Sequence, residues 1–132
     1  MREVEVSRFV RATPAELERY LSPAAIIEHE GTFTVVDSDD GQVTARGGGM
    51  EVVFAFEERD TGYRYRQVGD RGPFETMTTT LTYEPENEGS TVRARSSVSL
   101  GLPVASVTDR VAAWKRRGEL RRALEELATA FE

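Results

Sequence analysis

The only histidine in the chain lies between two carboxylates. His29 is flanked by Glu28 and Glu30. Neighbouring carboxylates favour the charged imidazolium, so they could raise the pKa of His29 and orient it as a general acid or base. A histidine in such a helix-terminal turn is more often a solvated surface residue, and we favour that interpretation. No metal site is expected, because the chain has no second histidine and no cysteine, and loose carboxylates hold zinc poorly.

Polar side chains share a face with apolar ones in three predicted strands. The three groups are Glu75 and Thr79 beside Met77, Ser96 beside Val92, and Tyr65 beside Gln67. A buried polar group without a partner is costly, so these residues could line a hydrated pocket in which Glu75 acts as an acid or base. It is equally open that Glu75 and Gln67 lie at strand ends in water, because alternation does not tell which face points inward.

Apolar and aromatic residues supply the other candidates for a ligand site. We predict that a ligand would contact Phe54, Phe56, Tyr65, Met77, Thr79, Ser96, Val107, Val111 and Trp114. The aromatic members could equally form an ordinary packed core. His29 and Glu75 are the two candidate catalytic residues, and the sequence holds no recognisable catalytic dyad or triad.

The elements that must position these residues are seven strands and three helices. The predicted strands cover residues 3–11, 32–37, 42–46, 50–58, 63–68, 74–83 and 90–100. The stretch Thr13-Pro14-Ala15-Glu16 has the spacing of a capping box with proline at the first helical position, which predicts a helix that ends near Ser22-Pro23. A second short helix is expected over residues 24–29. Six consecutive hairpin-linked strands imply an antiparallel meander, which places the fold in the α+β class.

A long helix is predicted over residues 103–131. Its apolar residues form two stripes at spacings of three and four, namely Val104, Val107, Val111 and Trp114, then Leu120, Leu124, Leu127 and Phe131. The stripes do not join, so we expect the buried face to shift near Gly118. We predict that the helix packs against the concave face of the sheet through Val107, Val111, Trp114, Leu124 and Leu127.

The same helix carries a basic run at residues 115–117, followed by Arg121 and Arg122. This run could contact anionic lipid or an acidic partner. Because Glu119 and residues 125–126 are acidic, we interpret the run as an ion-paired, solvated helix face.

Composition limits the classes of function. The chain has 132 residues, of which 39% are hydrophobic and 30% charged, with a net charge of -6 and no cysteine. The negative charge disfavours nucleic-acid binding, and no apolar run is long enough for stable membrane insertion. Met1 leads directly into an alternating strand, so no signal peptide is expected and a cytoplasmic location is favoured. Acidic excess with a single lysine, Lys115, is typical of salt-loving or GC-rich organisms.

Three stretches resemble the START-like, or SRPBCC, superfamily. They are the opening VEVSRFVRATPAELERYLS, the hairpin TTTLTYEPENEGSTVRARSSVSL and the closing RGELRRALEELATAFE. The superfamily includes polyketide cyclases and dehydratases, coenzyme-Q-binding proteins and lipid-transfer proteins, and the resemblance covers almost the whole chain. It implies one helix-grip domain over residues 1–132, in which a seven-stranded antiparallel sheet curls around the long C-terminal helix, with two short helices after the first strand.

The resemblance implies a cavity between the sheet and the long helix that takes a small apolar molecule such as a lipid, a quinone or a polyketide-like compound. We expect a carrier that uses no cofactor. Two alternatives stay open: a cyclase or dehydratase that uses the same cavity, and a protein-interaction module. The sequence does not determine the oligomeric state.

Overall fold

The computed structural model describes residues 2–69, 74, 76–99 and 105–132, and the side chains of the last range from Asp109 onward. Seven strands form one antiparallel sheet: β1 (Arg2–Val10), β2 (Thr34–Asp39), β3 (Gln42–Gly47), β4 (Met50–Arg59), β5 (Gly62–Val68), β6 (Thr76–Glu86) and β7 (Gly89–Ser99). The strand order across the sheet is β1-β7-β6-β5-β4-β3-β2. The predicted seven-stranded meander is confirmed, and the first strand closes it beside the last.

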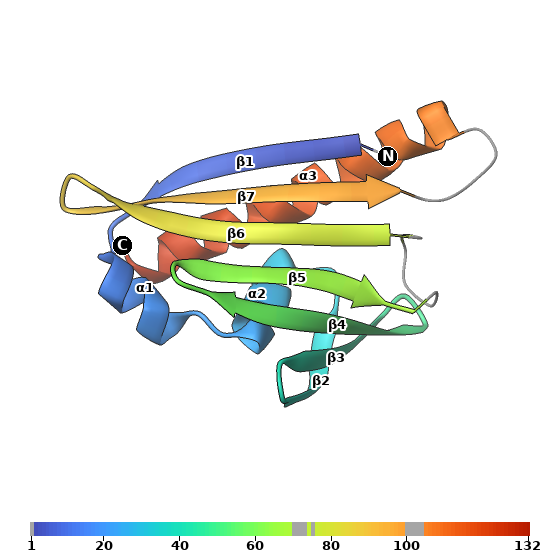
Figure 1. The fold of residues 1–132 in the computed structure, drawn as a ribbon, viewed down its shortest axis with the longest axis horizontal. Helices are drawn as coiled ribbons and strands as arrows, with labels where there is room; N and C mark the ends of the chain where they lie inside the picture. The colour runs from blue at the N-terminus through green and yellow to red at the C-terminus, as the bar shows by residue number, and fades with distance from the viewer. Residues whose placement is uncertain (1, 70–73, 75, 100–104) are drawn as a thin grey trace.

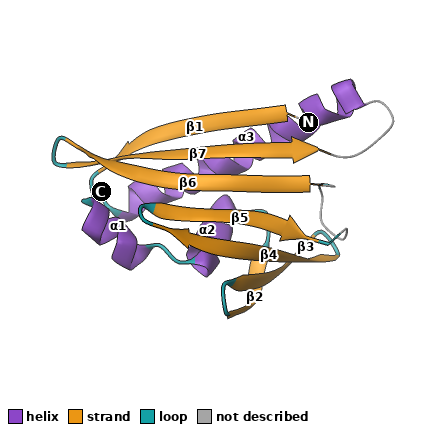
Figure 2. Ribbon diagram, in the orientation of Figure 1, coloured by secondary structure: helices purple, strands orange, loops and turns teal. Residues whose placement is uncertain are grey.

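Three helices lie on one side of this sheet (Figures 1 and 2). They are α1 (Pro14–Tyr20), α2 (Pro23–Glu30) and α3 (Ala105–Ala130). Helix α3 runs along β1 and β7 and also packs against α2. This arrangement is the helix-grip fold that the sequence predicted.

Local sequence explains where the short helices begin and end. The side chain of Thr13 accepts a hydrogen bond from the amide of Glu16, and the Glu16 carboxylate accepts one from the amide of Thr13, so the predicted capping box is confirmed. Ser22 caps α2 in the same way, by accepting a bond from the amide of Ala25. Gly31 ends α2 in the left-handed conformation, with φ of 80°.

The buried face of α3 differs from the predicted one. Val111 and Trp114 are 58% and 78% exposed, so the prediction that they pack against the sheet is wrong. The buried positions instead continue without a break along one side of the helix, at Asp109, Ala112, Arg116, Glu119, Leu120, Ala123, Leu124, Leu127 and Ala128. The predicted shift near Gly118 is also wrong, because the stripe of Leu120, Leu124 and Leu127 extends backwards through small and charged residues.

The side chain of Val107 lies outside the described residues, as does Glu75. The main apolar core extends from Phe54, Met77 and Ala112 to the region where α1, α2 and the end of α3 meet the sheet. Its members there include Leu17, Leu21, Ile26, Ile27, Leu81, Tyr83, Val92, Leu124 and Leu127.

Gly118 gives a test of the exposed side of α3. A Cβ at this position would meet no atom within 4 Å, so Gly118→Ala should stabilise the protein by about 0.5–1 kcal/mol through helix propensity. Gly31→Ala is the contrasting variant, because φ is +80° there and the added Cβ would lie 2.7 Å from Arg122 Cδ. In urea unfolding, Gly118→Ala should have a higher free energy of unfolding than the wild type, and Gly31→Ala a lower one. A loss of stability in Gly118→Ala would contradict the described surroundings of the helix.

Candidate functional site

Three of the predicted site residues are direct neighbours across the sheet. Tyr65 on β5 pairs with Thr79 on β6, and Thr79 pairs with Ser96 on β7. All three side chains are buried on the inner face, and the hydroxyl oxygens of Thr79 and Ser96 lie 2.8 Å apart. The register of the antiparallel strands therefore creates a row of hydroxyl groups beneath α3.

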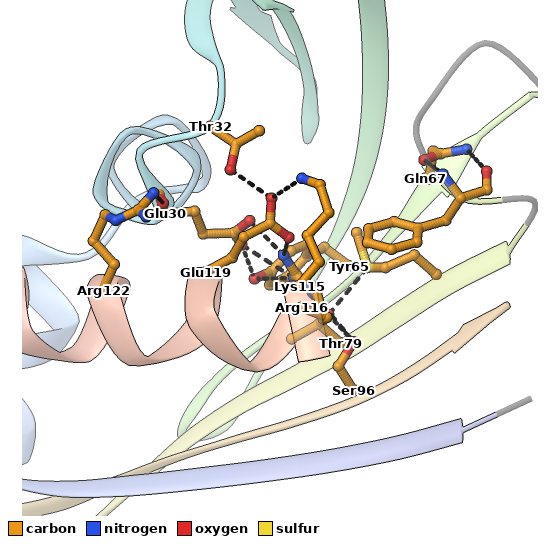
Figure 3. A network of polar contacts seen from close by, with 12 residues as sticks. Glu30, Thr32, Tyr65, Gln67, Thr79, Ser96, Lys115, Arg116, Glu119 and Arg122 are labelled. Atoms are coloured by element: carbon orange, nitrogen blue, oxygen red, sulfur yellow. Dashed lines mark hydrogen bonds and ion pairs between the residues drawn. The ribbon is translucent and has the colours of Figure 1, made fainter. Parts of the chain in front are cut away.

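The guanidinium of Arg116 comes down from α3 onto this row. It donates hydrogen bonds to the hydroxyl oxygens of Thr79 at 2.7 Å, Tyr65 at 3.0 Å and Ser96 at 3.3 Å. The Arg116 side chain is among the largest fully buried side chains in the fold. Figure 3 shows it between the helix and the strands.

Two buried carboxylates neutralise Arg116. Glu30, the last residue of α2, receives two parallel hydrogen bonds of 2.5 and 3.1 Å from the guanidinium, and its carboxylate also accepts one from the hydroxyl of Tyr65. Glu119, one turn along α3, accepts a third bond at 3.1 Å and is held from outside by Thr32 and Lys115. We refer to the six residues Glu30, Tyr65, Thr79, Ser96, Arg116 and Glu119 as the Arg116 network.

The charges in this network are fixed at neutral pH. Burial alone would lower the pKa of Arg116, but the charge of Glu30 outweighs it and raises the pKa above its usual value. Burial opposes ionisation of Glu119, yet the neighbouring Arg116 holds its pKa below the ordinary value. Burial and the nearby Glu30 charge raise the pKa of Tyr65 well above 10. Arg116 is therefore cationic, Glu119 anionic and Tyr65 neutral.

The network also satisfies its own hydrogen bonds. Among the described residues, no buried side-chain nitrogen or oxygen lacks a partner. Such a network is costly to assemble and stable once complete.

The other inward candidates surround this network. Phe54 and Met77 are 3% and 2% exposed, and Phe56 stacks on Tyr65 with ring centroids 4.5 Å apart. Phe54 and Met77 therefore point inward, and Phe56 packs partly buried against the core. Whether any of them contacts a ligand stays a prediction, as it does for Val111 and Trp114, which lie on the outer side of α3.

His29 does not join the network, although its neighbour Glu30 does. Its imidazole stacks on Tyr20, and Nε2 lies 3.0 Å from the Tyr20 hydroxyl. The expectation that flanking carboxylates raise its pKa is wrong: burial lowers the pKa of His29 and outweighs the opposing charges of Glu126 and Glu28. The imidazole lies half-buried between helices, away from the hydroxyl row.

Comparison with known proteins identifies the family of the chain. The family model described as "Polyketide cyclase / dehydrase and lipid transport" matches residues 1–132. The chain belongs to this family. No curated protein matches the sequence.

Solved structures agree on the START-like fold of this cyclase and lipid-transport family. An uncharacterised protein from Bacillus thuringiensis superposes with a TM-score of 0.78 at 13% identity, over 98% of both chains. A START superfamily protein from Mycobacterium smegmatis has a TM-score of 0.74 at 13% identity, over 98% of this chain and 99% of that one. The Aha1 dimer from Colwellia psychrerythraea has a TM-score of 0.67 at 14% identity, over 100% and 97%. At these identities the likeness concerns the fold alone.

The START-like fold is associated with binding hydrophobic ligands, and here the charged network occupies the space above the hydroxyl row. The predicted ligand cavity therefore stays a prediction. Within the residues that the structure describes, no three potential metal ligands lie together. None of the described helices has the length and apolar composition needed to cross a bilayer.

Sequence reasoning missed the three charged members of the network. Counting back from Leu124 and Leu120 in steps of four gives Arg116 and then Ala112, so the helical period already pointed to a buried arginine. A second indication was the group of hydroxyl-bearing residues Tyr65, Thr79 and Ser96. If these hydroxyl groups are buried, their oxygens need hydrogen-bond donors. Glu30 gave no comparable indication, because its role depends on where α2 ends relative to α3.

Removing Arg116 should be far more damaging than removing its neighbour. Arg116→Met leaves Glu30 and Glu119 buried without their cation, which should lower the free energy of unfolding by about 3–5 kcal/mol. Arg117→Met is the matched control, since Arg117 is exposed and should change stability by no more than about 0.5 kcal/mol. Guanidinium unfolding of both variants makes the comparison. Equal effects would refute the burial of Arg116.

His29 should make stability fall on mild acidification. Its folded pKa lies below the ordinary value of 6.5, so in the window just below that pH the unfolded chain binds more protons than the folded one. Stability is therefore fully present above pH 6.5 and declines as the pH falls toward the folded pKa. Urea unfolding from about pH 7 to 5 should show a shallower decline for His29→Gln than for the wild type. A histidine NMR titration with a midpoint above 6.5 would contradict the assignment.

Proposed function

We propose that the protein is a non-catalytic carrier of a small apolar molecule, which it holds between α3 and the inner face of the sheet. The family and its START-like fold support binding of a hydrophobic molecule. The observation that carries the non-catalytic part is the saturated Arg116 network. Every described acid, hydroxyl and guanidinium group in it is engaged, so proton transfer to a substrate would require one of these buried contacts to break.

The site that we propose is the half of the interior between Arg116 and the start of α3. Beyond Arg116 the space is packed by Leu120, Leu124 and Leu127. On the side of Arg116 toward the start of α3, Met77 on β6 pairs with Val98 on β7. The buried residue of α3 on this side is the small Ala112. A ligand would place its apolar body against Met77 and Phe54, and the network would form the polar end wall.

Entry of a ligand into this half requires side chains to move. Met77 is suited to this, because its unbranched thioether changes rotamer at low cost. Specificity would then come from the fixed charges and hydroxyl groups of the Arg116 network, which favour a ligand with one polar end.

The test begins with native mass spectrometry of the protein purified from its own host, to identify a retained ligand. Binding and chemical fate of that ligand are then measured with Phe54→Leu, Met77→Ala, His29→Ala and Glu75→Gln, using conditions in which circular dichroism shows each variant folded. Loss of apolar contact in Met77→Ala should weaken binding roughly tenfold, or about 1.4 kcal/mol.

The polar variants and a control complete the experiment. Val36→Ala removes a half-exposed aliphatic side chain away from the proposed site and should not alter affinity. His29→Ala and Glu75→Gln should also leave binding unchanged. Conversion of the ligand by the wild type, abolished in either polar variant while binding persists, would favour the cyclase or dehydratase alternative and reject the carrier.

A further inference from the structure

Between positions 110 and 122, before the exposed Glu125 and Glu126, the outer side of α3 carries a concentrated positive charge on a protein that is negative overall. All exposed charged side chains between positions 110 and 122 are basic: Arg110, Lys115, Arg117, Arg121 and Arg122. The net charge of the chain is -6. We call these five cations, together with Val111, Trp114 and Gly118, the basic α3 face.

The fold creates this face by hiding the one acidic residue in the stretch. Glu119 is the only carboxylate between positions 110 and 122, and it is 4% exposed because it turns inward to Arg116. Of the outer cations, Lys115 remains within 3.3 Å of Glu119. Among the described residues, no carboxylate lies within ion-pairing distance of Arg117 or Arg121. The sequence-based interpretation of an ion-paired face is wrong for these two residues.

Apolar side chains stand among the cations. Trp114 is 78% exposed and Val111, one turn before it, is 58% exposed. Gly118 lacks a side chain, and a hollow of about 360 Å³ opens there, lined by Trp114, Arg121 and Arg122 among others. The indole thus forms one wall of a hollow that is also lined by four basic side chains and by the inward-turned Glu119.

We infer that the basic α3 face docks on the surface of a membrane rich in anionic phospholipid. An indole prefers the boundary between headgroups and acyl chains, since it combines an apolar ring with a polar N–H. Basic side chains around it are attracted to anionic headgroups, and their aliphatic stems lie along the apolar boundary. Because the apolar side of α3 packs in the fold, contact with the membrane would rest on these cations and on the exposed indole.

The distribution of the cations favours a flat occupant. At 100° per residue, Arg117 and Lys115 fall on opposite sides of Trp114, and the face extends along the helix for about 18 Å. A membrane surface covered with anionic headgroups can contact the cations on both sides of Trp114 at the same time. The inference goes beyond the proposed function and does not rest on it, because docking requires no ligand in the interior.

The test uses the intrinsic fluorescence of Trp114, which is the only tryptophan. The full-length protein is mixed with vesicles of phosphatidylcholine alone or of phosphatidylcholine with 40% phosphatidylglycerol, at low salt. Co-sedimentation and a blue shift of the emission are expected with the anionic vesicles only. Both should be reversed at about 0.5 M salt, because exposed charges are then screened.

Matched variants locate the contact. Arg117→Gln with Arg121→Gln should weaken binding to the anionic vesicles at least tenfold. Arg64→Gln with Arg66→Gln removes the same charge from exposed positions on β5 and should weaken it less than twofold. Both pairs of residues are exposed, so folding should be preserved in each case.

Four results would overturn the inference. They are equal effects of the two double variants, co-sedimentation without an emission shift, an equal emission shift with a soluble acidic polypeptide such as polyglutamate, and a concentration-dependent shift without vesicles. The last two would identify an acidic protein segment or a second copy of the chain as the occupant. Ligand binding in the interior is measured separately, so failure of docking leaves the carrier hypothesis intact, and the reverse also holds.

Discussion

The ion pair between Arg116 and Glu30 is the interaction on which the arrangement of the elements depends. It joins the end of α2 to the middle of α3, and through Tyr65, Thr79 and Ser96 it ties both helices to three strands. A guanidinium and a carboxylate lose much hydration energy on burial, and only good geometry and further hydrogen bonds offset that loss. Because incomplete networks are costly, α2 and α3 have one favourable position over the sheet.

This constraint places Arg116 between two parts of one apolar core. On one side of Arg116, Leu124 and Leu127 of α3 pack with residues of α1 and α2. On the other side, the helix turns the small Ala112 inward, opposite Met77 and Phe54. In a fold that binds hydrophobic molecules, the Arg116 network would separate the region that must stay packed from the region whose side chains can move to admit a ligand. It would also give a bound molecule an orientation.

Helix α3 also connects the interior to the surface. Its inner side must supply a cation and a carboxylate to the network, so Glu119 faces inward and is lost from the exterior. The remaining charged residues at positions 110–122 are basic and face solvent, together with Trp114. The charge of the outer side is therefore a consequence of how the interior is neutralised, and one helix serves both regions.

The sequence by itself determined the elements and their order. Alternation identified the strands, Thr13 marked the start of the first helix, and consecutive hairpins required an antiparallel sheet, because these features depend on near neighbours in the chain. Strand alternation also correctly grouped Tyr65 with Gln67 and Met77 with Thr79. Tertiary structure alone decided which side of α3 is buried. The first half of α3 could bury the stripe that ends at Trp114, or the positions that continue the leucine stripe through Arg116, and hydrophobicity favoured Trp114. Arg116 lies inside only because Glu30, 86 positions away in the chain, meets it there, and no local pattern encodes that contact.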